Sequence, residues 1–273
     1  LDPKTGAVQK LQLGEEISNS FSVDGNDAYI VTTSKLYRLS AGSDNVPTIV
    51  WSAAYQNIGR RKTGQLSAGS GTTPTILGQG KYVAIADNAD QTHVVVYRTD
   101  EQLSAGVDRK VCEVDVFDQG KGAVEDSLVG FGRTIIVTNN YGYSYNPNFI
   151  DFGSVPGMAR IDIDADGNGC EKKWTNTDVN AASYGAKVST KTGLAYVVAR
   201  KTDPNRQVYW DYPLGMNVWY WTAIDVQTGA TVWEQLAGTG RWFDGYWPLP
   251  FIGPNGAIYA AGNGGIFAMR DAR

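Results

Sequence analysis

Histidine and cysteine are scarce in this chain of 273 residues, which has one histidine, His93, and two cysteines, Cys112 and Cys170. Copper and structural zinc sites usually take several His or Cys ligands, so the composition argues against both. A Ser-His-Asp relay would depend on His93 alone. The position of His93 in "DNADQTHVVVY" instead favours a solvated turn residue that enters a strand.

Long apolar runs and an excess of positive charge are also missing. No stretch approaches the ~20 apolar residues that cross a bilayer, so we expect no membrane span. The 24 basic residues are outnumbered by 28 acidic ones, and the formal net charge is −4. Without a basic field, the sequence argues against nucleic acid as a partner.

An initiator methionine and a signal peptide are absent as well. The chain begins at Leu1, inside what reads as a strand–turn–strand unit, "LDPKTGAVQKLQLG". We interpret it as a processed or trimmed product, so the missing signal peptide says nothing about its compartment. We expect an exported protein, either secreted or periplasmic.

Glycine is abundant, with 32 residues, together with 15 tyrosines and 8 tryptophans. This profile is typical of many short strands joined by tight turns. Apolar runs bounded by Gly, Asn and Asp recur about every 8–12 residues, and groups of four recur about every 40–55 residues. The pattern predicts an all-β propeller with four-stranded antiparallel blades. We expect a single domain over residues 1–273, with five blades at about 17–55, 68–118, 124–178, 182–238 and 245–273.

The fifth unit, residues 245–273, lacks an outer strand. Residues 1–14 read as the outer strand of a blade whose inner strands lie elsewhere. In one interpretation they complete the fifth blade and close a five-bladed ring. In the other, upstream blades are missing from this chain and a second chain supplies them.

The stretch "TAIDVQTGATVWE" carries the strongest family signal. Its pattern, A-x-D-x-x-T-G-x-x-x-W, resembles the repeat of quinoprotein-type (PQQ-repeat) propellers and is formed by Ala223, Asp225, Thr228, Gly229 and Trp233. In that superfamily the tryptophan packs between neighbouring blades, and Trp51 and Trp174 hold similar positions. The resemblance implies that Trp233 is buried, so that Trp233→Ala would cost on the order of 3–5 kcal/mol.

More narrowly, "GSGTTPT", "NNYGY" and "WTAIDVQTG" resemble a group of bacterial propeller proteins without an assigned activity. Those relatives extend further upstream, which favours a trimmed chain or missing blades over a native five-bladed ring. PQQ itself is not expected. Five blades are visible where quinoprotein dehydrogenases commonly have eight, and their adjacent-cysteine pair is absent.

Two smaller motifs leave alternatives open. Cys112 and Cys170 hold matching places on consecutive outer strands, which favours a disulfide in an exported protein. Blades diverge towards the rim, however, and a bridge needs Cα atoms within ~7 Å. The acidic run "DIDADGNG", from Asp162, resembles the start of a calcium loop, but Lys173 stands where the closing Glu belongs. A plain turn is favoured there over a surface calcium site.

Polar side chains gather where the first strands of successive blades would meet. They include Ser18–Ser20, Thr72, Thr73, Glu125–Ser127, Ser183 and Tyr184, and the next strands end in Asp87, Asn88, Asn139, Asn140, Arg200 and Asn263. Carboxylate and amide oxygens that converge on one axis suit a hard cation such as Ca²⁺. We expect Asp87, Glu125, Asn139 and Asn140 as ligands of this ion. The alternative is that these side chains cap strand ends and contact water.

Aromatic residues cluster in "YWDYPLGMNVWYW" and "RWFDGYWPLP", and "YGYSYNPNFIDFG" adds to them. They predict a ligand-stacking surface over one channel mouth, with blade packing or contact with another chain as alternatives. The expected ligand-binding residues are Thr73, Asn88, Tyr141, Tyr184, Arg200, Trp242 and Trp247.

Two functions follow from these patterns. The first is binding of a small molecule or partner through the channel mouth of an exported propeller. The second is an enzyme, either a Ca²⁺-assisted hydrolase or lactonase or, behind it, a quinoprotein-type oxidoreductase. In the hydrolase, Asp87 or Glu125 would act as the base while the cation polarises a carbonyl oxygen.

Overall fold

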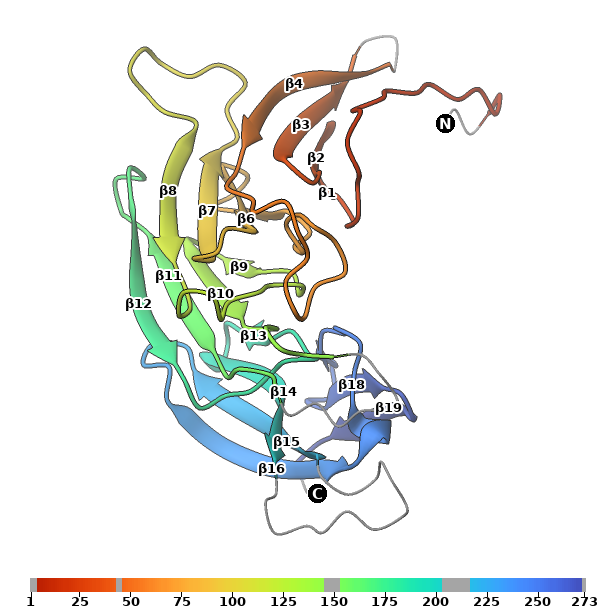
Figure 1. Ribbon diagram of the computed structural model, residues 1–273, viewed down its shortest axis with the longest axis vertical. Helices are drawn as coiled ribbons and strands as arrows, with labels where there is room; N and C mark the ends of the chain where they lie inside the picture. Colours follow the sequence, from red (N-terminus) through yellow and green to blue (C-terminus); the bar gives the residue numbers. More distant parts are fainter. Residues whose placement is uncertain (1–3, 43–45, 145–152, 203–216, 272–273) are drawn as a thin grey trace.

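The computed structural model describes residues 4–42, 46–144, 153–202 and 217–271. These residues form five antiparallel sheets, four with four strands and one with three. The sheets follow one another around an arc, with the outer strands β8, β12 and β16 on its convex side (Figure 1). This arrangement confirms the predicted β-propeller fold.

Within each sheet the strands lie in chain order, from an inner to an outer strand. The first two sheets are β1 (Ser22–Asp24), β2 (Asp27–Val31), β3 (Lys35–Ala41), β4 (Pro47–Ala54) and β5 (Thr75–Leu77), β6 (Tyr82–Ala86), β7 (His93–Arg98), β8 (Lys110–Asp115). The next two are β9 (Val129–Phe131), β10 (Thr134–Thr138), β11 (Met158–Ile163), β12 (Cys170–Asn176) and β13 (Lys187–Ser189), β14 (Leu194–Thr202), β15 (Asn217–Asp225), β16 (Thr231–Thr239). The last is β17 (Phe251–Ile252), β18 (Ile258–Gly262) and β19 (Gly265–Met269), preceded by the 3₁₀ turn η1 (Arg241–Phe243).

The second strands of the second and third sheets are buried on both faces. β6 and β10 are apolar throughout or nearly so, and every residue of both is buried. The outer strands β12 and β16 are largely exposed or half-buried. Short continuous apolar runs fit strands that are covered by a neighbouring sheet on each side. The core therefore lies between successive sheets, in three hydrophobic clusters. Among the described residues, no helix has the length and apolar character needed to cross a membrane.

A disulfide joins the second and third sheets. Cys112 of β8 is bonded to Cys170 of β12, with a Cα–Cα distance of 5.8 Å. These outer strands contact one another, so the two sheets have not diverged at the level of the cysteines. The structure thereby decides between the two alternatives that the sequence left open.

Two tryptophans dock onto the next sheet as the repeat pattern predicts. Trp51 of β4 donates its Nε1–H to the carbonyl of Thr99 at 3.3 Å, and Trp174 of β12 donates to Val226 at 2.9 Å. Both acceptors directly follow the third strand of the next sheet. Trp233 was expected to be buried but is half-buried, as Trp174 also is, and it differs from Trp174 in lacking a hydrogen bond to a turn of the next sheet among the described residues. The sheet that follows it ends at β19, so no such turn covers its ring within the described part of the chain.

The predicted completion of the fifth blade by residues 1–14 is not found among the described residues. Residues 4–14 form no strand, and β17–β19 remains a three-stranded sheet. The N-terminal segment and β19 lie at opposite ends of the arc (Figure 1).

The contact of Trp174 with the fourth sheet predicts a stability effect. Gly229 has φ +74°, and a Cβ added there would lie 2.5 Å from the Trp174 ring. We expect Gly229→Ala to lower the free energy of unfolding by about 2–3 kcal/mol, from backbone strain and overpacking together. Gly193→Ala is the control, since Gly193 has φ +70° but open space around its Cβ position. Urea unfolding that gave both variants equal losses would contradict the docking role.

Candidate ligand site at the inner strands

The segments that lead into the inner strands β9, β13 and β17 meet at one place. The backbone N–H of Trp247 donates to the carbonyl of Ser183 at 3.0 Å, and that of Gly185 donates to Pro248 at 3.3 Å. A Cβ on Gly185 would lie 3.3 Å from the Cβ of Asp126. Residues just before the first strands of three successive sheets therefore form one contiguous cluster.

Asn140 holds this cluster together. Its Nδ2 donates to Asp126 Oδ2 at 2.6 Å and to the Ala182 carbonyl at 3.0 Å. Its Oδ1 accepts the backbone N–H groups of Glu125, at 2.7 Å, and Asp126, at 3.2 Å. One amide side chain thus fixes both acidic residues and ties them to the fourth sheet.

Four buried polar atoms of this cluster have no hydrogen-bond partner among the described residues. They are Glu125 Oε2, Asp126 Oδ1, Ser183 Oγ and Trp247 Nε1. Leaving a buried polar group unpaired costs about 1–3 kcal/mol, and native structures hold few such groups. A concentration of four on adjoining segments indicates a site built for a polar ligand. We name it the inner-strand site.

Both carboxyl groups of the inner-strand site are protonated to a substantial extent near neutral pH. Burial raises the pKa of Glu125 to about 7, although a hydrogen bond from the Leu66 backbone and the charge of Arg61 oppose the shift. Burial also raises the pKa of Asp126 to about 8, opposed by the bonds from Asn140 and Thr138. Such shifts are common where proteins bind or react.

A cavity of about 300 Å³ lies beside this site. Its walls are the loop between β4 and β5 and the residues around Trp247, and they comprise Arg61–Leu66, Tyr143, Ser144, Tyr246 and Trp247. Trp247 has φ +56°, a rare conformation for a large side chain, and its ring packs edge-on against Tyr143 with centroids 5.5 Å apart. Strained backbone of this kind persists where surrounding contacts hold it, often at binding sites.

Lys62 anchors the cavity loop. Its ammonium group is buried and donates to the carbonyls of Ala89 and Gly122, the latter at 3.0 Å, and to Thr92 Oγ1 at 2.9 Å. Burial lowers its pKa to about 8. The loop is thus fixed to the second and third sheets, which places Arg61 close enough to Glu125 to act on its charge.

Asp87 belongs to a different cluster. Its carboxylate accepts the backbone N–H of His93 at 2.9 Å and lies 2.6 Å from His93 Nδ1. His93 is buried, which corrects the expectation of a solvated turn residue. Glu113 Oε1 lies 3.6 Å from the same nitrogen. The ligand atoms of these three residues lie within 4.8 Å of one another, so they have the geometry to hold a metal ion. This group shares only Asp87 with the predicted calcium ligands.

The predicted amide ligands make hydrogen bonds to the backbone. Asn139 Oδ1 accepts the N–H groups of Ala123 and Tyr141, both at 3.1 Å. Asn88 Nδ2 donates to the carbonyls of Arg60 and Ala68 and to Asn57. These bonds fit the alternative in which the amides cap strand ends.

The other predicted ligand-binding residues are spread around the site. Tyr184 is fully buried, with its hydroxyl 2.7 Å from the Phe243 carbonyl. Arg200 is buried and donates to Ser154. Trp242 is exposed under the guanidinium of Arg241. Thr73 and Tyr141 are half-buried. Trp210 and Tyr212, in the aromatic stretch "YWDYPLGMNVWYW", lie outside the described residues.

The first aspartate of the acidic run "DIDADGNG", Asp162, is paired with an arginine of the same strand, β11. The guanidinium of Arg160 forms an ion pair with Asp162 at 2.7 Å, and Thr134 also donates to Asp162. Asp166 accepts the backbone N–H of Asn168 at 3.0 Å. These contacts support the plain turn that the sequence favoured.

Of the predicted site residues, Glu125 and Trp247 lie in the inner-strand site, and Asn140 holds its two acidic residues in place. Asp126 and Ser183, which the sequence placed at the ring centre, join them. The sequence reasoning missed the basic cavity loop, "GRRKTG", and the partners of Asp87. An Arg-Arg-Lys run between two predicted blades was the available signal. The role of this run depends on which distant segments pack against it, and the sequence does not show these.

Among the comparisons with known proteins, those with solved structures support the fold. No family model matches the chain. An uncharacterized protein of Archaeoglobus fulgidus is 24% identical over 97% of this chain and 54% of its own length, so the chain spans about half of that relative.

Among solved structures, the quinohemoprotein alcohol dehydrogenase of Comamonas testosteroni aligns with a TM-score of 0.59 and 12% identity, covering 94% of this chain and 41% of the enzyme. The periplasmic gluconolactonase of Pseudomonas aeruginosa aligns with a TM-score of 0.51 and 14% identity, over 89% of this chain and 62% of that protein. The resemblance to quinoprotein-type propellers is thereby confirmed at the level of the fold, which by itself carries no function.

Proposed function

We propose that the protein binds a small, oxygen-rich molecule at the inner-strand site, which corresponds to the channel mouth of a propeller. The observation that carries this proposal is the set of four buried polar atoms without partners, contributed by three successive sheets. Trp247, which carries one of these atoms, lines the cavity of about 300 Å³, and that cavity provides space for the ligand.

The protonation of the site indicates what kind of ligand it takes. Near neutral pH, raised pKa values leave Glu125 and Asp126 substantially protonated, so each carboxyl can donate a hydrogen bond. Trp247 Nε1 is a donor, and Ser183 Oγ donates or accepts. Because donors predominate, hydroxyl, carbonyl or carboxylate oxygens of a ligand are the complementary groups.

A calcium ion is the alternative ligand. Glu125 and Asp126 each offer a carboxylate oxygen without a partner, whereas Asn139 and Asn140 each already accept two backbone bonds. The carboxylates, rather than the amides, would hold the ion. They must lose protons first, so cation binding would strengthen as the pH rises.

An enzymatic role has one specific observation in its favour. The pKa of Glu125, at about 7, suits a general acid or base near neutral pH. A Ca²⁺-assisted hydrolase or lactonase is thus the second candidate, with a quinoprotein-type oxidoreductase behind it. Asp87, the other predicted base, is hydrogen-bonded to His93.

The disulfide supports a secreted or periplasmic location.

Thermal unfolding tests the ligand proposal. We expect gluconate or glucono-lactone at pH 6.5, or Ca²⁺ at pH 8 after chelation, to raise the melting temperature of the wild type. A ligand at a hundred times its Kd adds about 2.7 kcal/mol. Glu125→Gln should remove most of the shift, whereas the exposed control Glu171→Gln should keep it. No shift with any of these probes, or an equal shift in both variants, would count against the inner-strand site.

A further inference from the structure

Trp233 is a docking tryptophan whose docking partner is missing from the described structure. Trp51, Trp174 and Trp233 all lie on outer strands, and each directly follows the extra residue of a β-bulge in its own strand. The first two reach a turn of the next sheet. Trp233 instead lies beside a cavity of about 950 Å³.

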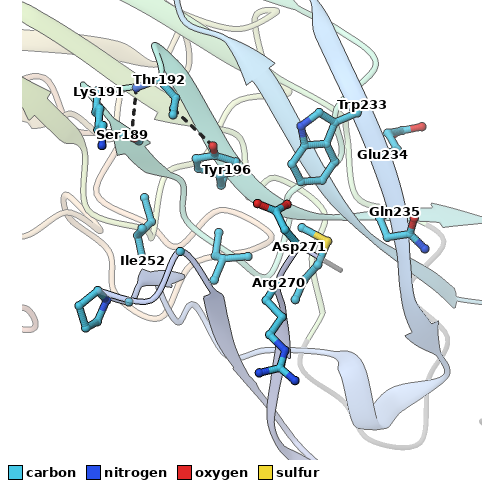
Figure 2. Close-up of a pocket in the computed structure, with 15 residues that line it drawn as sticks. Ser189, Lys191, Thr192, Tyr196, Trp233, Glu234, Gln235, Ile252, Arg270 and Asp271 are labelled. Atoms are coloured by element: carbon cyan, nitrogen blue, oxygen red, sulfur yellow. Dashed lines mark hydrogen bonds between the residues drawn. The ribbon is translucent and has the colours of Figure 1, made fainter. Parts of the chain in front are cut away.

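This cavity lies between the fourth sheet and the fifth. Trp233 and Tyr196 contribute one wall, with ring centroids 6.0 Å apart, and the stretch Met269–Asp271 contributes another. Figure 2 shows Trp233, Tyr196 and Asp271 around the same space. Asp271 closely follows β19, as Thr99 follows β7 and Val226 follows β15. The cavity therefore occupies the place of a turn between a third and a fourth strand.

The edge of β19 is open in the described part of the molecule. β19 pairs with β18 on one side, and the sheet ends there. Ile266, within this edge strand, is 79% exposed. An edge strand with free backbone groups and an exposed apolar side chain is a template for an added strand.

Residues 4–14 have the matching features. Gly6 has φ +73° and the Ala7 N–H lies 3.3 Å from Thr5 Oγ1. In the turn that leads into β16, Gly229 has φ +74° and the Ala230 N–H lies 3.3 Å from Thr228 Oγ1. The segment thus already has the turn of an outer strand, while residues 7–14 pair with no described strand.

We propose that residues 4–14 of a second copy of this chain add to β19 as its fourth strand, with their Thr5-Gly6 turn covering Trp233. The segment lies at the opposite end of the arc from β19 (Figure 1), so contact between two copies is head-to-tail. Such a contact uses two different surfaces and builds rings or open chains. Strand addition to a sheet edge supplies the backbone bonds. The association is independent of any ligand at the inner-strand site.

Sedimentation velocity over a range of concentrations tests this association. We expect the full chain to self-associate, and Gly6→Val to weaken association about tenfold or more, which is 1.4 kcal/mol. Gly25→Val is the matched control, because Gly6 and Gly25 both have positive φ and open space at the Cβ position. A synthetic peptide of residues 2–14 should compete with association and blue-shift tryptophan emission in the wild type but less in Trp233→Phe.

Three outcomes would overturn the proposal. The first is a chain that stays monomeric and shows no response to the peptide. The second is association that Gly6→Val leaves unchanged. The third is a monomer in which Gly6→Val alters Trp233 emission at every concentration, since the segment would then dock on its own fifth sheet.

Discussion

Replacing Asp126 with asparagine is expected to stabilise the protein at pH 8 and to flatten its dependence on pH. Burial raises the pKa of Asp126 from 3.8 to about 8. Between these values the unfolded chain loses the proton while the folded chain keeps it, so the contribution of Asp126 to stability is greatest below pH 4 and falls as the pH rises towards 8. The loss has an upper limit of about 5–6 kcal/mol. An asparagine keeps an acceptor for Asn140 and carries no charge.

Urea unfolding at intervals from pH 5 to pH 8 measures this effect. The free energy of unfolding of the wild type should fall over the range, and that of Asp126→Asn should fall much less. Glu125→Gln should remove a smaller part, with the same sign, between about pH 4.5 and 7. Asp118→Asn, at an exposed position, serves as the control. Equal slopes for the wild type and Asp126→Asn would show that Asp126 does not stay protonated in the fold.

Removing the disulfide is expected to have the second largest effect. Cys112 and Cys170 are 58 residues apart in the sequence. Closing a loop of that length restricts the unfolded chain by about 4 kcal/mol in the chain-entropy description. We expect the double variant Cys112→Ser with Cys170→Ser to lose about 2–4 kcal/mol of unfolding free energy.

Reduction of the wild type provides an independent check. Dithiothreitol should lower the stability of the wild type to that of the double serine variant and leave that variant unchanged. A double variant as stable as the oxidised wild type would show that the bridge is dispensable. Because the bridge joins the second and third sheets at their outer strands, its loss should first loosen the rim and leave the inner-strand site least affected.

The sequence alone was sufficient for the fold, because the signals that specify it are local. Each sheet has its own run of short apolar strands and tight turns, and continuous apolar runs such as β6 and β10 are the buried middle strands. The Thr228-Gly229 turn needs only its own side chain and a glycine at positive φ. The pairing of the two cysteines depended on how closely β8 approaches β12, and the sequences of these two strands do not specify that distance.

The inner-strand site could be foreseen only in part. Glu125 and Asp126 were expected near the axis because the repeat places them before an inner strand. Which carboxyl groups become buried away from solvent, and which charges lie near them, depends on segments distant in the chain, such as the loop that carries Arg61. Asp87 follows a similar strand yet pairs with His93. A carboxylate's neighbours, and hence its pKa, are properties of the packed structure.

Trp233 and Trp174 show, within one repeated motif, what local sequence specifies and what only tertiary packing decides. Local sequence places both on outer strands and predicts the same packing for both. Trp174 meets Gly229 and the Val226 carbonyl of the next sheet, whereas Trp233 borders a cavity beside a sheet that ends at β19. Sequence by itself determined the strands, the turns and the order of the sheets, since these depend on neighbours along the chain. Tertiary structure alone decided which polar groups are buried without partners and which docking surface stays open, because both depend on what packs against them.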